Sequence, residues 1–162
     1  MFHNQHFWGI VLFAALFEIR SRVRSHKIRY IETLLHEIAH LVLAKVFRGN
    51  PQRFTITPKK QETGAVVLGS VSCANIVSLN AFPISLAPLI MIPLSYVLYS
   101  HWHLWFPGTM SCSLGLYLVM FVLLSASIPS STDWKLAFRN PVTGICWTGV
   151  MVAGCWIVNS FL

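Results

Sequence analysis

The sequence predicts an all-α polytopic membrane protein, with about five transmembrane helices and a short β-hairpin after the second one. The 162 residues are 55% hydrophobic and 10% charged, whereas a soluble domain carries about 25% charged residues. From Thr63 to Thr132 the chain contains no Asp, Glu, Lys or Arg. Such a stretch is typical of several spans joined by short uncharged turns. We expect one membrane-embedded domain over residues 1–162, located in the cell (inner) membrane.

The net charge of +7 does not indicate a nucleic-acid partner. The basic residues gather at the ends of apolar runs, where lysine and arginine meet lipid headgroups. No basic helix is interleaved with aromatic residues on a polar background. The expected partner is therefore the lipid bilayer, and not nucleic acid.

The first half of the chain predicts two helices and a hairpin. Residues 7–19 form the first apolar run and residues 30–47 the second helix. Gly49-Asn50-Pro51 predicts its end, since glycine suits a left-handed cap and proline cannot continue a helix. Residues 53–70 alternate polar and apolar types around a Pro- and Gly-containing turn, which predicts a β-hairpin at the membrane surface. The alternative is that residues 65–80 form a sixth, weak span.

The second half predicts three further spans, separated by an aromatic turn and a proline-containing break. The spans are expected at residues 82–99, 111–128 and 142–162. The first of them contains Pro83, Pro88 and Pro93, which free backbone carbonyls and predict a kinked or partly unwound helix. The turn is expected at residues 101–108 and the break at residues 129–134.

A His-Glu-x-x-His motif lies in the second predicted helix, at His36, Glu37 and His40. Helical spacing of four residues places the two histidines on one face, one turn apart. Two neutral imidazoles so placed can share a Zn²⁺ ion at roughly 2.0–2.1 Å, with the glutamate beside them as general base. The alternative is a chance match at an interfacial helix end.

A catalytic zinc site needs a third protein ligand, and Asp133 is the candidate. It is the only aspartate in the chain, and an ionisable residue within a membrane is usually paired or bound to metal. The alternative role is helix capping, because Ser-Ser-Thr-Asp before an apolar run is typical of a cap. Asn75 and Asn80 could hydrogen-bond a substrate strand or a developing oxyanion, or could equally cap helices.

With these motifs the chain resembles the site-2 protease family of intramembrane zinc metalloproteases. The similarity is best over residues 34–57, where the motif helix ends in a small basic turn and runs into a strand, and Gly64-Ala65-Val66 fits a second strand. The resemblance implies that His36 and His40 are zinc ligands, Glu37 the catalytic base and Asp133 the third ligand. The family pattern N-x-x-P-x-P-x-x-D-G reads here as residues 125–134, without its asparagine and final glycine.

The function expected from the resemblance is hydrolysis of peptide bonds in a membrane-protein or peptide substrate by metal-activated water. The hairpin could clamp an unwound substrate segment as an added strand. Two alternatives remain open. One is a non-catalytic membrane protein, a chaperone or regulator that retains the zinc-site motif. The other is a membrane-surface zinc peptidase with a different third ligand, a glutamate, which the lack of any glutamate after residue 62 disfavours.

Overall fold

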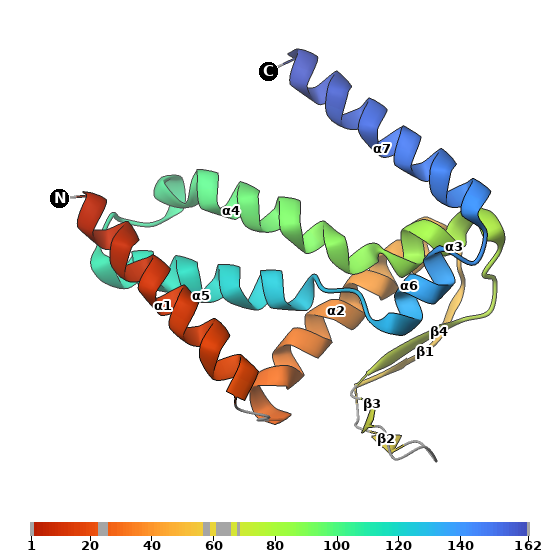
Figure 1. Ribbon diagram of the computed structural model, residues 1–162, viewed down its shortest axis with the longest axis horizontal. Coiled ribbons are helices and arrows are strands. Elements are labelled where there is room, and N and C mark those ends of the chain that lie inside the picture. The colour runs from red at the N-terminus through yellow and green to blue at the C-terminus, as the bar shows by residue number, and fades with distance from the viewer. Residues whose placement is uncertain (1, 23–25, 57–58, 61–65, 68, 162) are drawn as a thin grey trace.

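The computed structural model describes residues 2–22, 26–56, 59–60, 66–67 and 69–161, and in these ranges it consists largely of helices (Figure 1). The elements are α1 (Phe2–Arg22), α2 (His26–Val46), β1 (Pro51–Thr55), β2 (Lys59–Lys60), β3 (Val66–Val67), β4 (Ser70–Cys73), α3 (Ser78–Ser85), the 3₁₀-helix η1 (Ala87–Ile90), α4 (Met91–Trp105), α5 (Met110–Ala126), α6 (Ser131–Ala137) and α7 (Pro141–Phe161).

The core forms where α2 meets η1, α4 and α5. A stripe on α2 made by Leu35, Ala39 and Leu43 recurs every four residues, as expected for one face of a helix. This stripe packs against the buried side chains of Met91 and Leu123. The next stripe of α2 carries the two histidines of the motif, so the core fixes their position.

The prediction of about five transmembrane helices is wrong. Among the described residues, no single helix is both long and apolar enough to cross a membrane. Two pairs reach that length only when joined across a break: α3 with η1 and α4, bent by 49°, and α5 with α6, bent by 57°. Prolines and capping residues divide two of the apolar runs, residues 78–105 and 110–137, into shorter helices.

The predicted hairpin is longer than expected and is interrupted. β1 pairs antiparallel with β4, and β2 pairs antiparallel with β3. The paired strands therefore reach residue 73, so the alternative span at residues 65–80 is wrong. Residues 61–65, which hold most of the predicted turn, together with Glu62 and most of the Gly64-Ala65-Val66 segment, lie outside the described residues.

The end of α2 differs from the expected glycine cap. Arg48 and Asn50, and not Gly49, have positive φ angles, of 54° and 51°. The amide of Gly49 donates to the carbonyl of Ala44 at 2.7 Å, a bond typical of a Schellman ending. A Cβ on Gly49 would lie 2.8 Å from Cδ1 of Ile84. The glycine therefore leaves room for the Ile84 side chain of α3, the helix that supplies a contact to the site.

One later boundary also differs from the prediction. The aromatic residues from His101 to Trp105 continue α4 instead of forming a turn. The last helix, α7, packs mainly against α3 and otherwise extends away from the rest of the molecule (Figure 1).

Candidate metal centre

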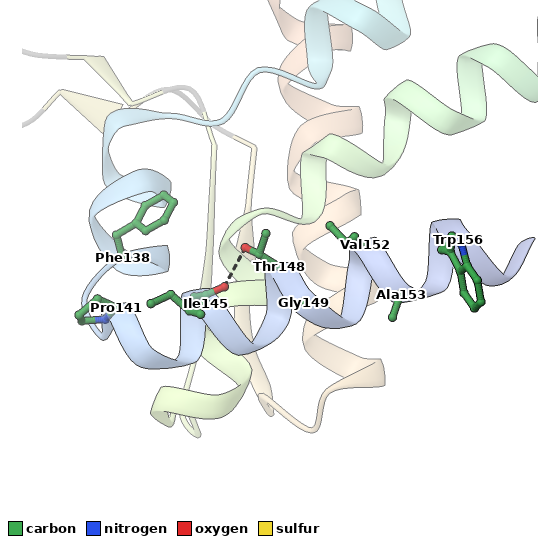
Figure 2. A pocket seen from close by; sticks show the side chains of 9 residues that line it. Phe138, Pro141, Ile145, Thr148, Gly149, Val152, Ala153 and Trp156 are labelled. Carbon is green, nitrogen blue, oxygen red and sulfur yellow. Dashed lines mark hydrogen bonds between the residues drawn. The ribbon is translucent and has the colours of Figure 1, made fainter. Parts of the chain in front are cut away.

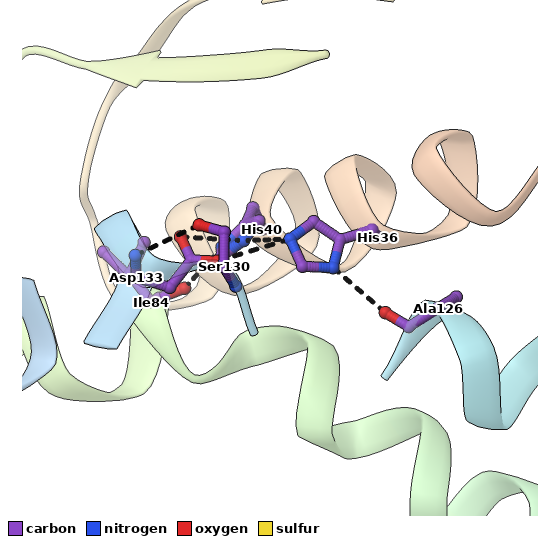
Figure 3. A network of polar contacts seen from close by, with 6 residues as sticks. All are labelled: His36, His40, Ile84, Ala126, Ser130 and Asp133. Atoms are coloured by element: carbon purple, nitrogen blue, oxygen red, sulfur yellow. Dashed lines mark hydrogen bonds and ion pairs between the residues drawn. The ribbon is translucent and has the colours of Figure 1, made fainter. Parts of the chain in front are cut away.

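The structure brings together the two motif histidines and the only aspartate of the chain. Nε2 of His36 and Nε2 of His40 lie 3.2 Å apart, on successive turns of α2. From α6, Oδ2 of Asp133 lies 3.4 Å from Nε2 of His36, and its Oδ1 lies 3.4 Å from Nε2 of His40. Figure 3 shows these side chains pointing toward one another from two elements far apart in the sequence. His40 is buried, and His36 and Asp133 are nearly so.

Each imidazole is oriented by a backbone carbonyl. Nδ1 of His40 donates to the carbonyl of Ile84 at 2.7 Å, and Nδ1 of His36 donates to the carbonyl of Ala126 at 3.0 Å. Because a carbonyl oxygen only accepts, each Nδ1 carries the hydrogen, and the Nε2 of a neutral ring then presents a lone pair. Such partners on the second ring nitrogen are usual for metal-bound histidines.

The Nε2 lone pairs of His36 and His40 and the carboxylate of Asp133 therefore face one another, with no hydrogen-bond donor among these atoms. In a tetrahedral site with Zn–N bonds of roughly 2.0–2.1 Å, neighbouring ligand atoms lie about 3.3 Å apart. The three separations of 3.2, 3.4 and 3.4 Å match that edge length. His36, His40 and Asp133 thus form a group that could hold a metal ion.

Asp133 also caps α6, so the two roles expected for it are not alternatives. Its Oδ2 accepts from the amide of Ser130 at 2.6 Å, while its own amide donates to Oγ of Ser130 at 3.2 Å. This reciprocal capping box fixes the carboxylate at the first turn of α6. The carboxylate is thereby aimed at the two imidazoles.

The charges of the cluster shift the pKa values of its members. Burial alone would raise the pKa of Asp133, but the polar contacts with His36 and His40 and the hydrogen bond from Ser130 hold it well below its usual range. Burial alone would lower the pKa of His36, but the interaction with Asp133 raises it. Both shifts favour an ionised carboxylate facing a positive charge, the arrangement that suits a cation.

Glu37 lies beside the cluster and contacts the β-arm, as we call the paired strands β1 to β4 and the described residues that join them. A Cβ on Gly69 would lie 2.8 Å from Cγ of Glu37 and 2.9 Å from Cγ2 of Thr33, so this glycine lets the chain before β4 pack directly on α2. Burial raises the pKa of Glu37, and His40, His36 and the backbone amide of Val71 partly oppose that rise. A carboxyl with a raised pKa is suited to accept and return a proton.

Asn75 and Asn80 lie at helix ends and are not members of the cluster. Asn80 donates to the carbonyls of Phe47 and Asn75, and its Oδ1 accepts from the amide of Val77. Asn75 donates to the carbonyl of Arg48 at 3.1 Å. These bonds join the end of α2 to the start of α3, as the capping alternative expects.

The residues that sequence reasoning missed are Ile84, Ala126 and Gly69. Ile84 and Ala126 act through main-chain carbonyls, so their side chains give no signal in the sequence. Gly69 acts through the absence of a side chain. Pro88, four residues after Ile84, indicates that this carbonyl lacks its helical amide but not which donor it meets, and Ala126 has no such proline.

An apolar groove of about 860 Å³ runs along α7, lined in part by Phe138, Ile145 and Trp156 (Figure 2). It contains no member of the metal cluster and no ionisable side chain. The groove is large and open, but its lining side chains offer no group suited to bind a metal or to transfer a proton. The site is therefore defined by the convergence of ligands and not by the size of a cavity.

No protein-family model, curated protein or solved structure matches this chain.

Proposed function

We propose that the protein is a zinc metalloendopeptidase of the site-2 protease type, which hydrolyses peptide bonds in membrane-protein substrates. The observation that carries the proposal is the convergence of two Nε2 atoms and one carboxylate at 3.2–3.4 Å, with both Nδ1 atoms held by carbonyls. His36, His40 and Asp133 would hold the zinc, and a site with three protein ligands keeps one position open. Zinc bound there would supply Lewis-acid activation of water and of the scissile carbonyl.

Glu37 is the proposed general base. It follows His36 directly on α2 and is buried beside the cluster. Its carboxylate accepts a proton from the attacking water and returns that proton to the leaving amine, which completes hydrolysis. Among the described residues, the group of potential ligands contains one carboxylate, that of Asp133, which is already proposed as a ligand.

The substrate is proposed to lie in extended form beside β4. β4 pairs with β1 along one edge, and the chain leading into it packs on Glu37 through Gly69. A strand could add along the other edge of β4, since main-chain pairing needs no specific side chain. Exposed apolar side chains, among them Tyr96, Ile145 and Trp156, support a membrane location for the protein and its substrate.

Replacement of Glu37 by Gln tests the function. The variant keeps the shape of the side chain and all three metal ligands, so zinc content should equal that of the wild type. Loss of the general base should lower turnover roughly 10²–10⁴-fold. The measurements are zinc per chain by mass spectrometry and cleavage of fluorescein-labelled casein in detergent micelles.

Glu32→Gln is the matched control. Glu32 is equally buried on the same helix, but it pairs with Arg20 at 3.1 Å and not with the metal cluster. Its replacement should leave turnover per folded chain within a few-fold of wild type. Zinc-loaded wild type without turnover, or an unaffected Glu37→Gln variant, would instead favour a non-catalytic protein that retains the metal site.

A further inference from the structure

The three prolines of the α3–α4 region each leave one carbonyl without its helical partner. Proline has no amide hydrogen, so the carbonyl four residues earlier loses its donor. The affected carbonyls are those of Leu79, Ile84 and Leu89, which precede Pro83, Pro88 and Pro93 by four residues. Each of these carbonyls therefore lacks the amide that a regular α-helix would supply, although the amides of Leu86 and Met91 are directed toward those of Ile84 and Leu89.

Two of the three carbonyls accept a hydrogen bond from a side chain of another helix. The carbonyl of Ile84 accepts from Nδ1 of His40 on α2 at 2.7 Å, and the carbonyl of Leu79 accepts from Nε1 of Trp147 on α7 at 2.7 Å. Among the described residues, no side-chain donor reaches the carbonyl of Leu89. The carbonyl freed by Pro88 therefore contacts a residue of the candidate metal centre, and the one freed by Pro83 contacts α7. The one freed by Pro93 contacts neither.

We propose that Pro88 is a positioning residue of the metal centre, which reserves the carbonyl of Ile84 for His40. The inference rests on the proposed function in that it takes His40 as a metal ligand. Pro88 is fully buried and stands at the start of η1, where α3 has ended at Ser85. Its ring excludes both the continued helix and the competing amide.

The reserved carbonyl determines which nitrogen of His40 faces the metal. With Nδ1–H held by the carbonyl, Nε2 is free of hydrogen and lies 3.2 Å from Nε2 of His36. An amide at position 88 would compete for the same oxygen, and His40 would lose the bond that selects its tautomer and ring orientation. Loss of such a partner typically lowers metal affinity 10–100-fold.

The test compares Pro88→Ala with Pro83→Ala and Pro93→Ala. All three restore one backbone amide in the same region, but only the first competes with His40. Cobalt(II) binding, followed by its visible absorption, should weaken 10–100-fold in Pro88→Ala. It should stay within about threefold of wild type in the two controls, because their carbonyls do not contact a metal ligand.

A second measurement needs no metal. In metal-free protein labelled with ¹⁵N-histidine, the imidazole shifts should show His40 as the Nδ1–H tautomer in wild type and in both controls. Pro88→Ala should show a mixture that includes the Nε2–H form. Should Pro88→Ala not fold, Pro88→Gly provides the same amide with less tendency to extend α3.

The two measurements separate this inference from the proposed function. Wild-type affinity in Pro88→Ala, equal weakening in all three variants, or an Nε2–H tautomer of His40 in wild type would overturn the role of Pro88. Failure of the wild type to cleave any substrate would overturn the protease and leave the tautomer and cobalt results standing.

Discussion

A single carboxylate, that of Asp133, both caps α6 and belongs to the group that could hold a metal ion. Its Oδ2 accepts from the amide of Ser130 at 2.6 Å and also lies 3.4 Å from Nε2 of His36. The cap orders the Asp133 side chain in the absence of metal, so that binding of an ion would cost less conformational entropy. A ligand held in this way is suited to a rigid site.

Replacing Asp133 by Asn separates the two roles. The amide oxygen of asparagine can still accept from Ser130, but the charged ligand is lost. Zinc affinity should fall roughly 100-fold or more, because loss of an outer partner alone costs 10–100-fold. Zinc per chain after dialysis is the measurement. Ser130→Ala is the control, which should cost about 1 kcal/mol of stability and keep its zinc; equal zinc in Asp133→Asn would exclude Asp133 as a ligand.

At the scale of single residues, much of the candidate site could be predicted from the sequence, because its potential ligands are scarce residue types. A helical spacing of four placed His36 and His40 on one face, and the chain offered only one aspartate. The orienting carbonyls of Ile84 and Ala126 could not be predicted. Every residue has a carbonyl, and only the packed structure determines which one meets a given imidazole.

At the scale of elements, the site is built from helix breaks. The junction of α3 and η1, within one bent pair, deprives the carbonyl of Ile84 of the amide four residues later. The junction of α5 and α6, within the other pair, does the same for the carbonyl of Ala126. The amide of Ser130, which a continued α5 would direct to Ala126, is taken by Asp133. The breaks also explain why the spans expected at residues 82–99 and 111–128 are divided, since hydropathy does not report where the backbone leaves a helix.

The contact of the β-arm with α2 gives a prediction at this scale. Gly69→Ala would place a Cβ 2.8 Å from Cγ of Glu37, so the arm or the glutamate must shift. Such overpacking typically costs about 1–3 kcal/mol. We expect lower unfolding free energy in urea and lower casein turnover, with zinc content unchanged because no ligand moves.

The control for Gly69→Ala is Gly115→Ala, since a Cβ on Gly115 of α5 meets nothing within 4 Å. It should raise stability by up to about 1 kcal/mol through helix propensity and keep turnover. Full turnover in Gly69→Ala would show that the arm does not position Glu37.

At the scale of the whole molecule, the metal centre connects segments that are distant in the sequence. The cluster draws ligands from α2 and α6 and carbonyls from α3 and α5. α3 packs against both α2 and α6, so the ion would tie together helices that already share a neighbour. α7 supplies no ligand and is held to α3 in part by the bond from Trp147 to Leu79.

Metal binding should therefore stabilise the fold as a whole and not only one helix. Zinc at a hundredfold excess over its dissociation constant contributes about 2.7 kcal/mol when the unfolded chain does not bind it. For a chain of this size, that corresponds to a rise in Tm of roughly 5–10 °C. Thermal unfolding of metal-free protein, with and without zinc, measures the shift, and a chelator should reverse it. The same rise in Asp133→Asn would mean that zinc binds elsewhere, because that variant keeps the cap and loses only the charged ligand.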